Sequence, residues 1–348
     1  MSSVIKFAAV NTKVRALERY LLSNKDYQNM IQSKNVTEIM NYLKEKTLYG
    51  EFLEDFDTQN GRVDLLEVRS RMFVFKRYEK LVHYFTGENK KLFKMLFMRY
   101  EVENLKLLIR AVYRNEDIER VSNELIESHM FSKIDYKRLG SSTNIEELIN
   151  NLKGTLYFKL LKPYINENPN RLMFYMEMNL DRIYFKMLGK QIYKLPSSDQ
   201  KPMLELLGKN TDILNIQWIY RGLKFYKLSP EELFNYSLEY GYIKFDKLKE
   251  LCYSSSKEDF IEKLSETRYG FLFEDVATMD QFMERSMERY LYKVLINLKK
   301  QAKMNIMPSI IFMHELEFEM RDIFTLLEAK RYNFTEEETK GFLVRVIE

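Results

Sequence analysis

The stretch NLKLLIR, residues 104–110, indicates how this 348-residue chain is organised, because a close variant, NIQWIYR, follows at residues 215–221. Asparagine and arginine stand six residues apart in both stretches (110 − 104 = 6 and 221 − 215 = 6), and the stretches lie 215 − 104 = 111 residues apart. A third, less similar version is FEMRDIFTLL at residues 318–327. It has Arg321 at the position of the asparagines, 321 − 215 = 106 residues after Asn215. Recurrence at a fixed spacing predicts an internal repeat.

Other segments recur in the same order at nearly the same period. TEIMNYL, IEELINNL and EDFIEKL each carry an acid five positions before their final leucine, namely Glu38, Glu147 and Asp259. Each follows a short polar residue that predicts a helix start, with Asn35, Thr143 and Ser255 as the expected caps. Matching tyrosines and arginines follow these segments: Tyr49, Tyr157 and Tyr269, then Arg77, Arg182 and Arg289.

The length of the repeat indicates domains and not a solenoid. Solenoid units of one helix pair run to roughly 33–47 residues, whereas a unit of about 110 residues can bury its own core. We therefore predict three similar helical domains, at residues 1–115, 116–225 and 226–348.

Composition favours an all-α fold. The chain has only 11 glycines and 6 prolines, with 45% hydrophobic and 30% charged residues. Its one cysteine, Cys252, excludes an internal disulfide framework. The apolar run MPSIIFM, residues 307–313, is far shorter than the roughly 20 residues of a membrane span, so we expect a soluble chain.

The helix that carries the first motif is apolar on most faces, which predicts that it is buried. Lys106 and Arg110 stand four residues apart and share one face, as do Gln217 and Arg221. This polar strip must leave the core, line a cleft or meet an acid. We expect Arg110 and Arg221 to be partly buried and paired with carboxylates, Glu103 being the nearest candidate for Arg110.

Patterns typical of catalysis are missing from the sequence. The histidines, His83, His129 and His314, lack the paired spacing of a zinc site, and no glycine-rich phosphate loop is present. Carboxylates such as Glu317 and Glu319 are more simply explained by solvated helix faces and ion pairs than by a glycosidase-like pair. The net charge of +4 is not concentrated in a basic stripe, which argues against a nucleic-acid-binding protein. We predict no catalytic residue, cofactor, metal or small-molecule substrate.

Taken together, the motifs resemble those of the C subunit, called d in eukaryotes, of the V-type and A-type rotary ATPases. The resemblance rests on EVENLKLLIRAVY (residues 101–113), on the opening FAAVNTKVRALERYLLSNKDYQNMI (residues 7–31) and on HELEFEMRDI (residues 314–323). The middle copy departs from it, because Gln217 replaces the lysine. The residues that the resemblance marks as structural or partner-contacting are Glu101, Asn104, Lys106, Arg110, Asp212, Asn215, Arg221, Glu317, Glu319 and Arg321.

The resemblance implies a funnel-shaped subunit of three helical domains about a pseudo-threefold axis. Its wide face would receive the central shaft subunits of D and F type, and its base would sit on the membrane rotor ring at the cytoplasmic face. The implied role is to couple ATP hydrolysis or synthesis to H⁺ or Na⁺ transport. A helical scaffold of another assembly and an all-α enzyme are the alternatives.

Overall fold

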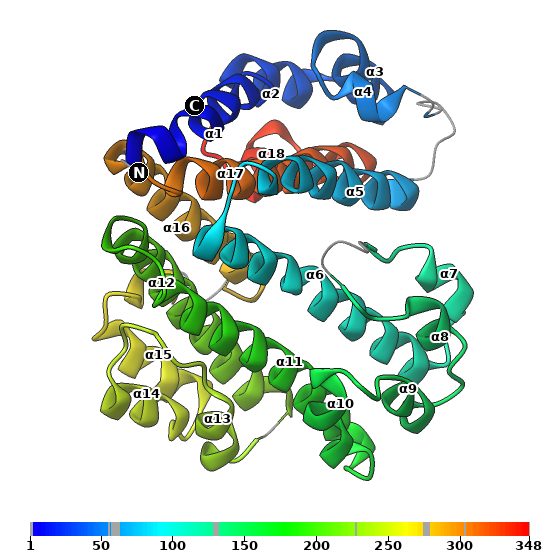
Figure 1. The fold of residues 1–348 in the computed structure, drawn as a ribbon, viewed down its shortest axis with the longest axis vertical. Coiled ribbons are helices and arrows are strands. Elements are labelled where there is room, and N and C mark those ends of the chain that lie inside the picture. The colour runs from blue at the N-terminus through cyan, green and yellow to red at the C-terminus, as the bar shows by residue number, and fades with distance from the viewer. Residues whose placement is uncertain are drawn as a thin grey trace. The chain divides into compact units, whose positions relative to one another are not determined.

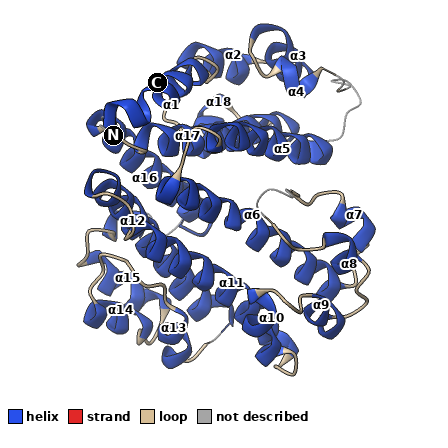
Figure 2. Ribbon diagram, in the orientation of Figure 1, coloured by secondary structure: helices blue, strands red, loops and turns tan. Residues whose placement is uncertain are grey.

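The computed structural model describes residues 3–54, 56, 63–127, 132–226, 228–273, 279–302 and 304–347. Every regular element in these ranges is helical, so the predicted all-α class is confirmed (Figure 2). Within the same ranges, none of the helices combines the length and the apolar character that crossing a membrane requires. Contacts divide the chain into two compact units, residues 1–85 with 269–348, and residues 86–268.

The first unit is built around one long, deeply buried helix, α17. It packs against α1, α3, α5, α16 and α18. Most of its side chains are buried, on all faces, which matches an apolar sequence with no clear amphipathic stripe. The elements of this unit are α1 (Ser3–Glu18), α2 (Asn24–Gln32), α3 (Val36–Lys46), α4 (Gly50–Leu53), α5 (Val63–Val82), the 3₁₀ turn η3 (Gly270–Phe273), α16 (Met279–Gln301), α17 (Met307–Arg331) and α18 (Glu336–Phe342).

The second unit is organised by the long helices α6 and α11, which lie side by side (Figure 1). The helix that carries the first motif, α6, is buried along Leu105, Leu108 and Ile109, as predicted. The elements of this unit are α6 (Gly87–Arg114), α7 (Ile118–Ser122), α8 (Tyr136–Gly140), α9 (Ile145–Asn151), α10 (Leu156–Leu161), the 3₁₀ turn η1 (Lys162–Tyr164), α11 (Pro169–Ile192), α12 (Ser197–Arg221), the π turn η2 (Gly222–Tyr226), α13 (Pro230–Tyr236), α14 (Phe245–Cys252) and α15 (Lys257–Ser265).

Three short helices begin with the same capping arrangement. The caps of α3, α9 and α15 are Asn35, Asn144 and Ser256, and each side chain accepts the backbone N–H of an acid three residues later. The expected cap Asn35 is therefore correct, whereas the expected caps Thr143 and Ser255 are wrong by one residue. Both stand just before the cap and donate their backbone N–H to the side chains of Glu147 and Asp259. Lys34 does the same toward Glu38.

Helical elements recur in a similar order along the chain, while the internal repeat itself stays a prediction. Short elements precede a pair of long helices three times: α2, α3 and α4 before α5 and α6, then α8, α9, α10 and η1 before α11 and α12, then α14, α15 and η3 before α16 and α17. The final helix of each set, α6, α12 or α17, carries one version of the opening motif. These helices hold the polar side chains described next.

Candidate functional site

On α6, the side chain of Asn104 fixes a segment that follows the helix. Its Nδ2 donates to the backbone carbonyl of Ile126 at 2.8 Å, and its Oδ1 accepts the Ile126 N–H at 3.1 Å. The buried amide side chain of Asn104 thus satisfies both the N–H and the carbonyl group of the Ile126 backbone. We call such a pairing, between a buried side chain of a long helix and the backbone about 22 residues later, a clamp.

The same clamp occurs on α12. Asn215 Nδ2 donates to the carbonyl of Leu238 at 3.0 Å, and Oδ1 accepts the Leu238 N–H at 2.7 Å. One turn earlier, the fully buried carboxylate of Asp212 accepts the backbone N–H groups of Tyr242 at 2.9 Å and Ile243 at 3.1 Å. Two sequence-predicted residues of the middle motif therefore act together on the same loop.

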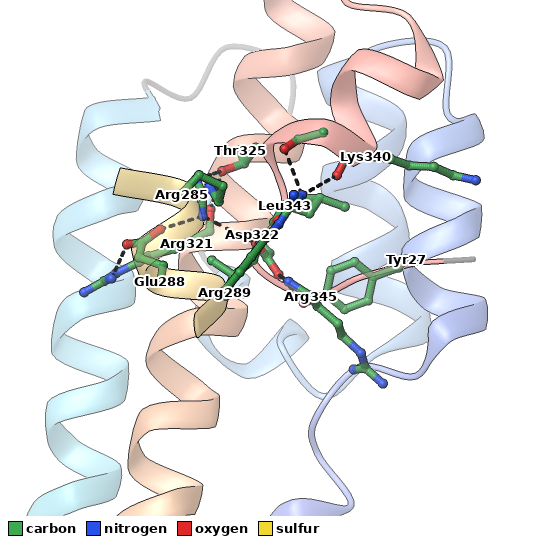
Figure 3. Close-up of polar contacts among 12 residues, drawn as sticks. Tyr27, Arg285, Glu288, Arg289, Arg321, Asp322, Thr325, Lys340, Leu343 and Arg345 are labelled. Carbon is green, nitrogen blue, oxygen red and sulfur yellow. Dashed lines mark hydrogen bonds and ion pairs between the residues drawn. The ribbon is translucent and has the colours of Figure 1, made fainter. Parts of the chain in front are cut away.

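On α17 the clamp is made by Asp322. Its Oδ1 accepts the N–H of Val344 at 2.6 Å and its Oδ2 accepts the N–H of Arg345 at 3.0 Å (Figure 3). The separation of 22 residues between Asp322 and Val344 equals that between Asn104 and Ile126. The sequence alignment that puts Arg321 at this position is therefore wrong by one residue. Arg321 instead forms an ion pair with Glu288 of α16.

An acid stands three residues before each clamp residue, and two of these acids accept a tyrosine hydroxyl. Glu101 accepts the Tyr157 hydroxyl at 2.7 Å. Glu319 accepts the hydroxyl of Tyr49 and also the backbone N–H of Leu22 at 2.8 Å. The two tyrosines are buried and belong to the matching set read from the sequence. Contacts of this kind connect α17 to segments that lie nearly 300 residues earlier in the chain.

Burial dominates the electrostatics of the acids on α17. Loss of hydration raises the pKa of Glu319 to about 8, against the lowering effect of its hydrogen bonds from Tyr49 and Leu22. Burial likewise raises the pKa of Asp322 to about 6, although two backbone N–H groups and Arg285 favour its charged form. A buried carboxylate whose oxygens already accept backbone N–H groups attaches one segment of the chain to another. Little of it remains free to bind a substrate.

The basic residues of the first motif face α11. Lys106 forms an ion pair with Asp181, and Arg110 binds Glu177 in a bidentate arrangement at 2.6 and 2.7 Å. Lys106 and Arg110 stand four residues apart, as do Glu177 and Asp181, and the pairing runs in opposite senses along the two helices. The two pairs therefore fix the register of an antiparallel contact between α6 and α11.

The partner expected for Arg110 is wrong. Glu103 lies beside Lys106 at 3.3 Å, whereas Arg110 pairs with Glu177. Glu103 is seven residues, about two turns, from Arg110, so the neighbouring helix offers an acid that is better placed. Burial lowers the pKa of Lys106, but the charges of Asp181 and Glu103 outweigh it and raise that pKa overall. Burial raises the pKa of Asp181 to about 6.

Other predicted residues have peripheral places. Arg110 is partly buried as expected, but Arg221 is exposed, because it is the last residue of α12 and the π turn η2 follows. Glu317 lies next to His314, with 3.4 Å between Oε2 and Nδ1. Glu317 and Glu319 are two residues apart on a helix and point to different sides, so they do not form a catalytic pair.

These residues hold segments of the chain together through hydrogen bonds and ion pairs. Among the described residues, no group of three or more histidine, cysteine, aspartate and glutamate side chains is placed to hold a metal ion. His83 is exposed, and His129 lies outside the described residues. Cys252 is buried, and its burial raises the pKa of the thiol to about 11, which suits packing and not nucleophilic attack.

The sequence interpretation missed Asp322, Glu177 and Asp181. Asp322 could have been found from spacing, since Glu319 and Asp322 repeat the three-residue interval of Glu101–Asn104 and Asp212–Asn215. The signal for Glu177 and Asp181 is an acidic pair four residues apart that mirrors the basic pair Lys106 and Arg110. Only the packing of α6 on α11 shows that the two pairs meet.

The chain is similar to known proteins along most of its length. The family model described as "ATP synthase (C/AC39) subunit" matches residues 10–342. The C subunit of the A-type ATP synthase of Methanosarcina mazei is 24% identical over 343 residues, which cover 97% of this chain and 92% of that protein. The protein of the same name from Methanocaldococcus jannaschii is 24% identical over 347 residues, which cover 97% of this chain and 86% of that protein.

Proposed function

Because this chain belongs to the ATP synthase (C/AC39) subunit family, we propose that it is a non-catalytic central-stalk subunit of a V-type or A-type rotary ATPase. In this role it forms a socket between the rotor shaft and the membrane rotor ring. The shaft subunits of D and F type and the ring are its partners. Its place is peripheral, at the cytoplasmic face of the membrane.

The observation that carries the proposal is the way in which the motif residues are used. Asn104, Asn215 and Asp322 each attach a distant backbone segment to a long buried helix. A part that transmits torque must resist deformation, and buried, fully satisfied polar contacts of this kind make a packed body rigid. A catalytic subunit would instead need polar groups that are open to a substrate.

The three predicted domains extend the proposal. If they superimpose about a pseudo-threefold axis, the funnel presents three similar faces to the shaft and distributes the contact among them. Single surface substitutions then have small effects on coupling, whereas combined changes at matching positions of the three copies have large ones. The transported ion, H⁺ or Na⁺, is selected in the ring and not by this chain.

The test is ATP-driven ion uptake into vesicles that contain the assembled complex with or without this chain. We expect ATP hydrolysis to continue without the chain while ion uptake is lost, since the shaft no longer grips the ring. The isolated chain is expected neither to bind nor to hydrolyse nucleotide. Full coupling in its absence would refute the socket. Recovery of shaft and ring subunits with the tagged chain distinguishes this role from that of an unrelated scaffold.

A further inference from the structure

The three sets of short elements that precede the pairs of long helices differ in charge. The middle set, α8, α9, α10 and η1 at residues 136–164, has five basic and two acidic residues, a net charge of 5 − 2 = +3. The first set, α2 to α4 at residues 24–53, has four of each and is neutral. The last set, α14, α15 and η3 at residues 245–273, has five basic and six acidic residues, a net charge of 5 − 6 = −1. Excess positive charge is therefore specific to the middle set.

Nearby acids do not balance the positive charges of the middle set. Its basic residues, all exposed, are Lys137, Arg138, Lys153, Lys159 and Lys162. Within the part of the chain that the structure describes, none of these side chains forms an ion pair with a carboxylate. In the last set, by contrast, Lys247, Lys257 and Lys263 each have an acidic partner. The two acids of the middle set, Glu146 and Glu147, lie in the first turn of α9, at the end of that helix away from Lys153.

Three of these lysines lie around an exposed apolar side chain. Lys153 and Lys162 share the ring of Phe158, with Nζ 6.0 and 5.5 Å from its centre, so their ammonium groups lie within about 12 Å of each other. Lys159 directly follows Phe158, and Leu156, which is 41% exposed, stands two residues before it. We call Lys153, Leu156, Phe158, Lys159 and Lys162 the basic patch.

The fold holds the basic patch in place and leaves it open. Tyr157 is buried within the patch, and its hydroxyl donates to Glu101 of α6, which anchors the first turn of α10. Gly154 has φ +90°, which favours glycine, and an added Cβ there would meet no atom within 4 Å. Arg138 Nε donates to Asn151 Oδ1 at 3.0 Å and joins α8 to the end of α9, which contacts α10 in turn (Figure 1). The patch is therefore a preformed surface.

The chemistry of the basic patch fits an acidic helix. Acidic side chains one or two turns apart on a helix are separated by about 5–11 Å, which suits the two ammonium groups beside Phe158. An apolar side chain between those acids would cover Leu156. A surface that is basic only for solubility needs no fixed positions for its charges, and lipid headgroups respond mainly to the number of basic residues. The shared ring of Phe158 restricts two of the charges, which favours a partner with carboxylates at fixed positions.

We propose that the basic patch binds an acidic helix of the rotor shaft, in a contact that the other two sets do not make. This inference rests on the function proposed above, which gives the chain a shaft and a ring as partners. A ring repeats one surface around its axis, whereas a shaft stands on that axis and presents a different side to each set. In the predicted pseudo-threefold arrangement, a contact made by one set of three holds the shaft in a single orientation and opposes its slipping by a third of a turn.

The experiment measures the affinity of the full chain for purified shaft subunits at several salt concentrations. We expect the triple variant Lys153→Glu, Lys159→Glu and Lys162→Glu to bind about tenfold or more weakly at low salt. The difference should shrink as the salt concentration rises, because salt screens exposed charges. Leu156→Ala should also weaken binding, by a factor that does not depend on salt, since it removes an apolar contact and no charge.

A second triple variant, Lys25→Glu, Lys34→Glu and Lys46→Glu, is the matched control. These lysines are exposed residues of the first set, and the change in net charge is the same. Circular dichroism and urea denaturation verify that both variants fold, and we expect the control to keep nearly the full affinity. If the first variant does not fold, glutamine at the same three positions replaces glutamate.

Unchanged binding by the variant of the basic patch, or an equal loss in the control, overturns the proposal. Sedimentation with vesicles of anionic or neutral phospholipid tests the other source of negative charge. Binding of the unmodified chain to anionic vesicles that is lost in the patch variant, while shaft binding is kept, assigns the patch to the membrane and also overturns the proposal. An unmodified chain that does not bind the shaft at all refutes the proposed function itself, so the two failures are distinguishable.

Discussion

The carboxylate of Glu319 accepts the backbone N–H of Leu22 at 2.8 Å, although 297 residues separate them in the chain. Its other oxygen accepts the hydroxyl of Tyr49. One buried side chain of α17 thereby connects the segments next to α2 and α4 to the last long helix. Closing a loop of this length costs conformational entropy, and the contacts that close it must offset that cost.

Replacement of Glu319 by alanine should reduce the free energy of unfolding by about 3 kcal/mol or more. Two buried donors, the Leu22 N–H and the Tyr49 hydroxyl, lose their acceptor, and each unsatisfied group costs about 1–3 kcal/mol. Urea denaturation measures the loss. Glu328→Ala on the same helix, whose partner Arg331 is exposed, is the control and should change stability by no more than about 0.5 kcal/mol.

Glu319 should also make stability depend on pH. Its pKa is raised from 4.5 to about 8, so the folded chain keeps a proton that the unfolded chain releases. The contribution is most favourable below pH 4.5 and is lost as the pH rises to about 8. Urea titrations at pH 5.5 and pH 8 should show a smaller fall in stability for Glu319→Gln than for the unmodified chain. An equal fall in both would exclude Glu319 as the source.

Removal of only one partner of the ion pair between Lys106 and Asp181 should reduce the stability of the chain strongly. Lys106→Ala leaves a buried carboxylate without its cation and should cost about 3–5 kcal/mol. The double variant Lys106→Met with Asp181→Leu removes both charges and should recover most of that loss. A double-mutant cycle that includes the single variants Lys106→Met and Asp181→Leu, measured by chemical denaturation, gives the coupling. Additive losses would show that the two side chains do not stabilise each other.

Arg110→Ala should have a smaller effect than Lys106→Ala. The Arg110 side chain is 41% exposed, so solvent screens its bidentate pair with Glu177, and a loss of about 1 kcal/mol or less is expected. Melting temperature and binding of the shaft subunits are measured together. A variant that changes neither would exclude both an ion-pair role and a socket role. Arg221→Ala, at an exposed helix end, is the matched comparison.

The predicted triplication requires that residues 1–115, 116–225 and 226–348 superimpose in an experimental structure. We expect the helices that begin at Asn35, Asn144 and Ser256 to occupy matching places, since their caps already make the same hydrogen bonds. Alanine at each of these caps should cost about 1 kcal/mol of stability. Equivalent helices in unrelated positions would contradict the repeat, whatever the similarity to the family.

Local rules explain what the sequence determined by itself. Few glycines and prolines, apolar helices and short polar caps indicate an all-α chain, because helix propensity and capping act over a few residues. The burial of α6 and the cap of α3 were readable in this way. The importance of Asn104 and Asn215 was also visible, as a motif that recurs at a fixed interval.

Tertiary structure decided the partners. Asn104 bonds to Ile126, Glu319 to Leu22 and Arg110 to Glu177, and no local rule selects these residues from the many polar groups of the chain. The alignment that favours Arg321 over Asp322 is wrong for the same reason. Neighbouring residues of a helix point in directions about 100° apart, so a shift of one position exchanges a buried acid for an exposed base. Which of them meets the backbone of Val344 and Arg345 is fixed by how α16, α17 and α18 pack together.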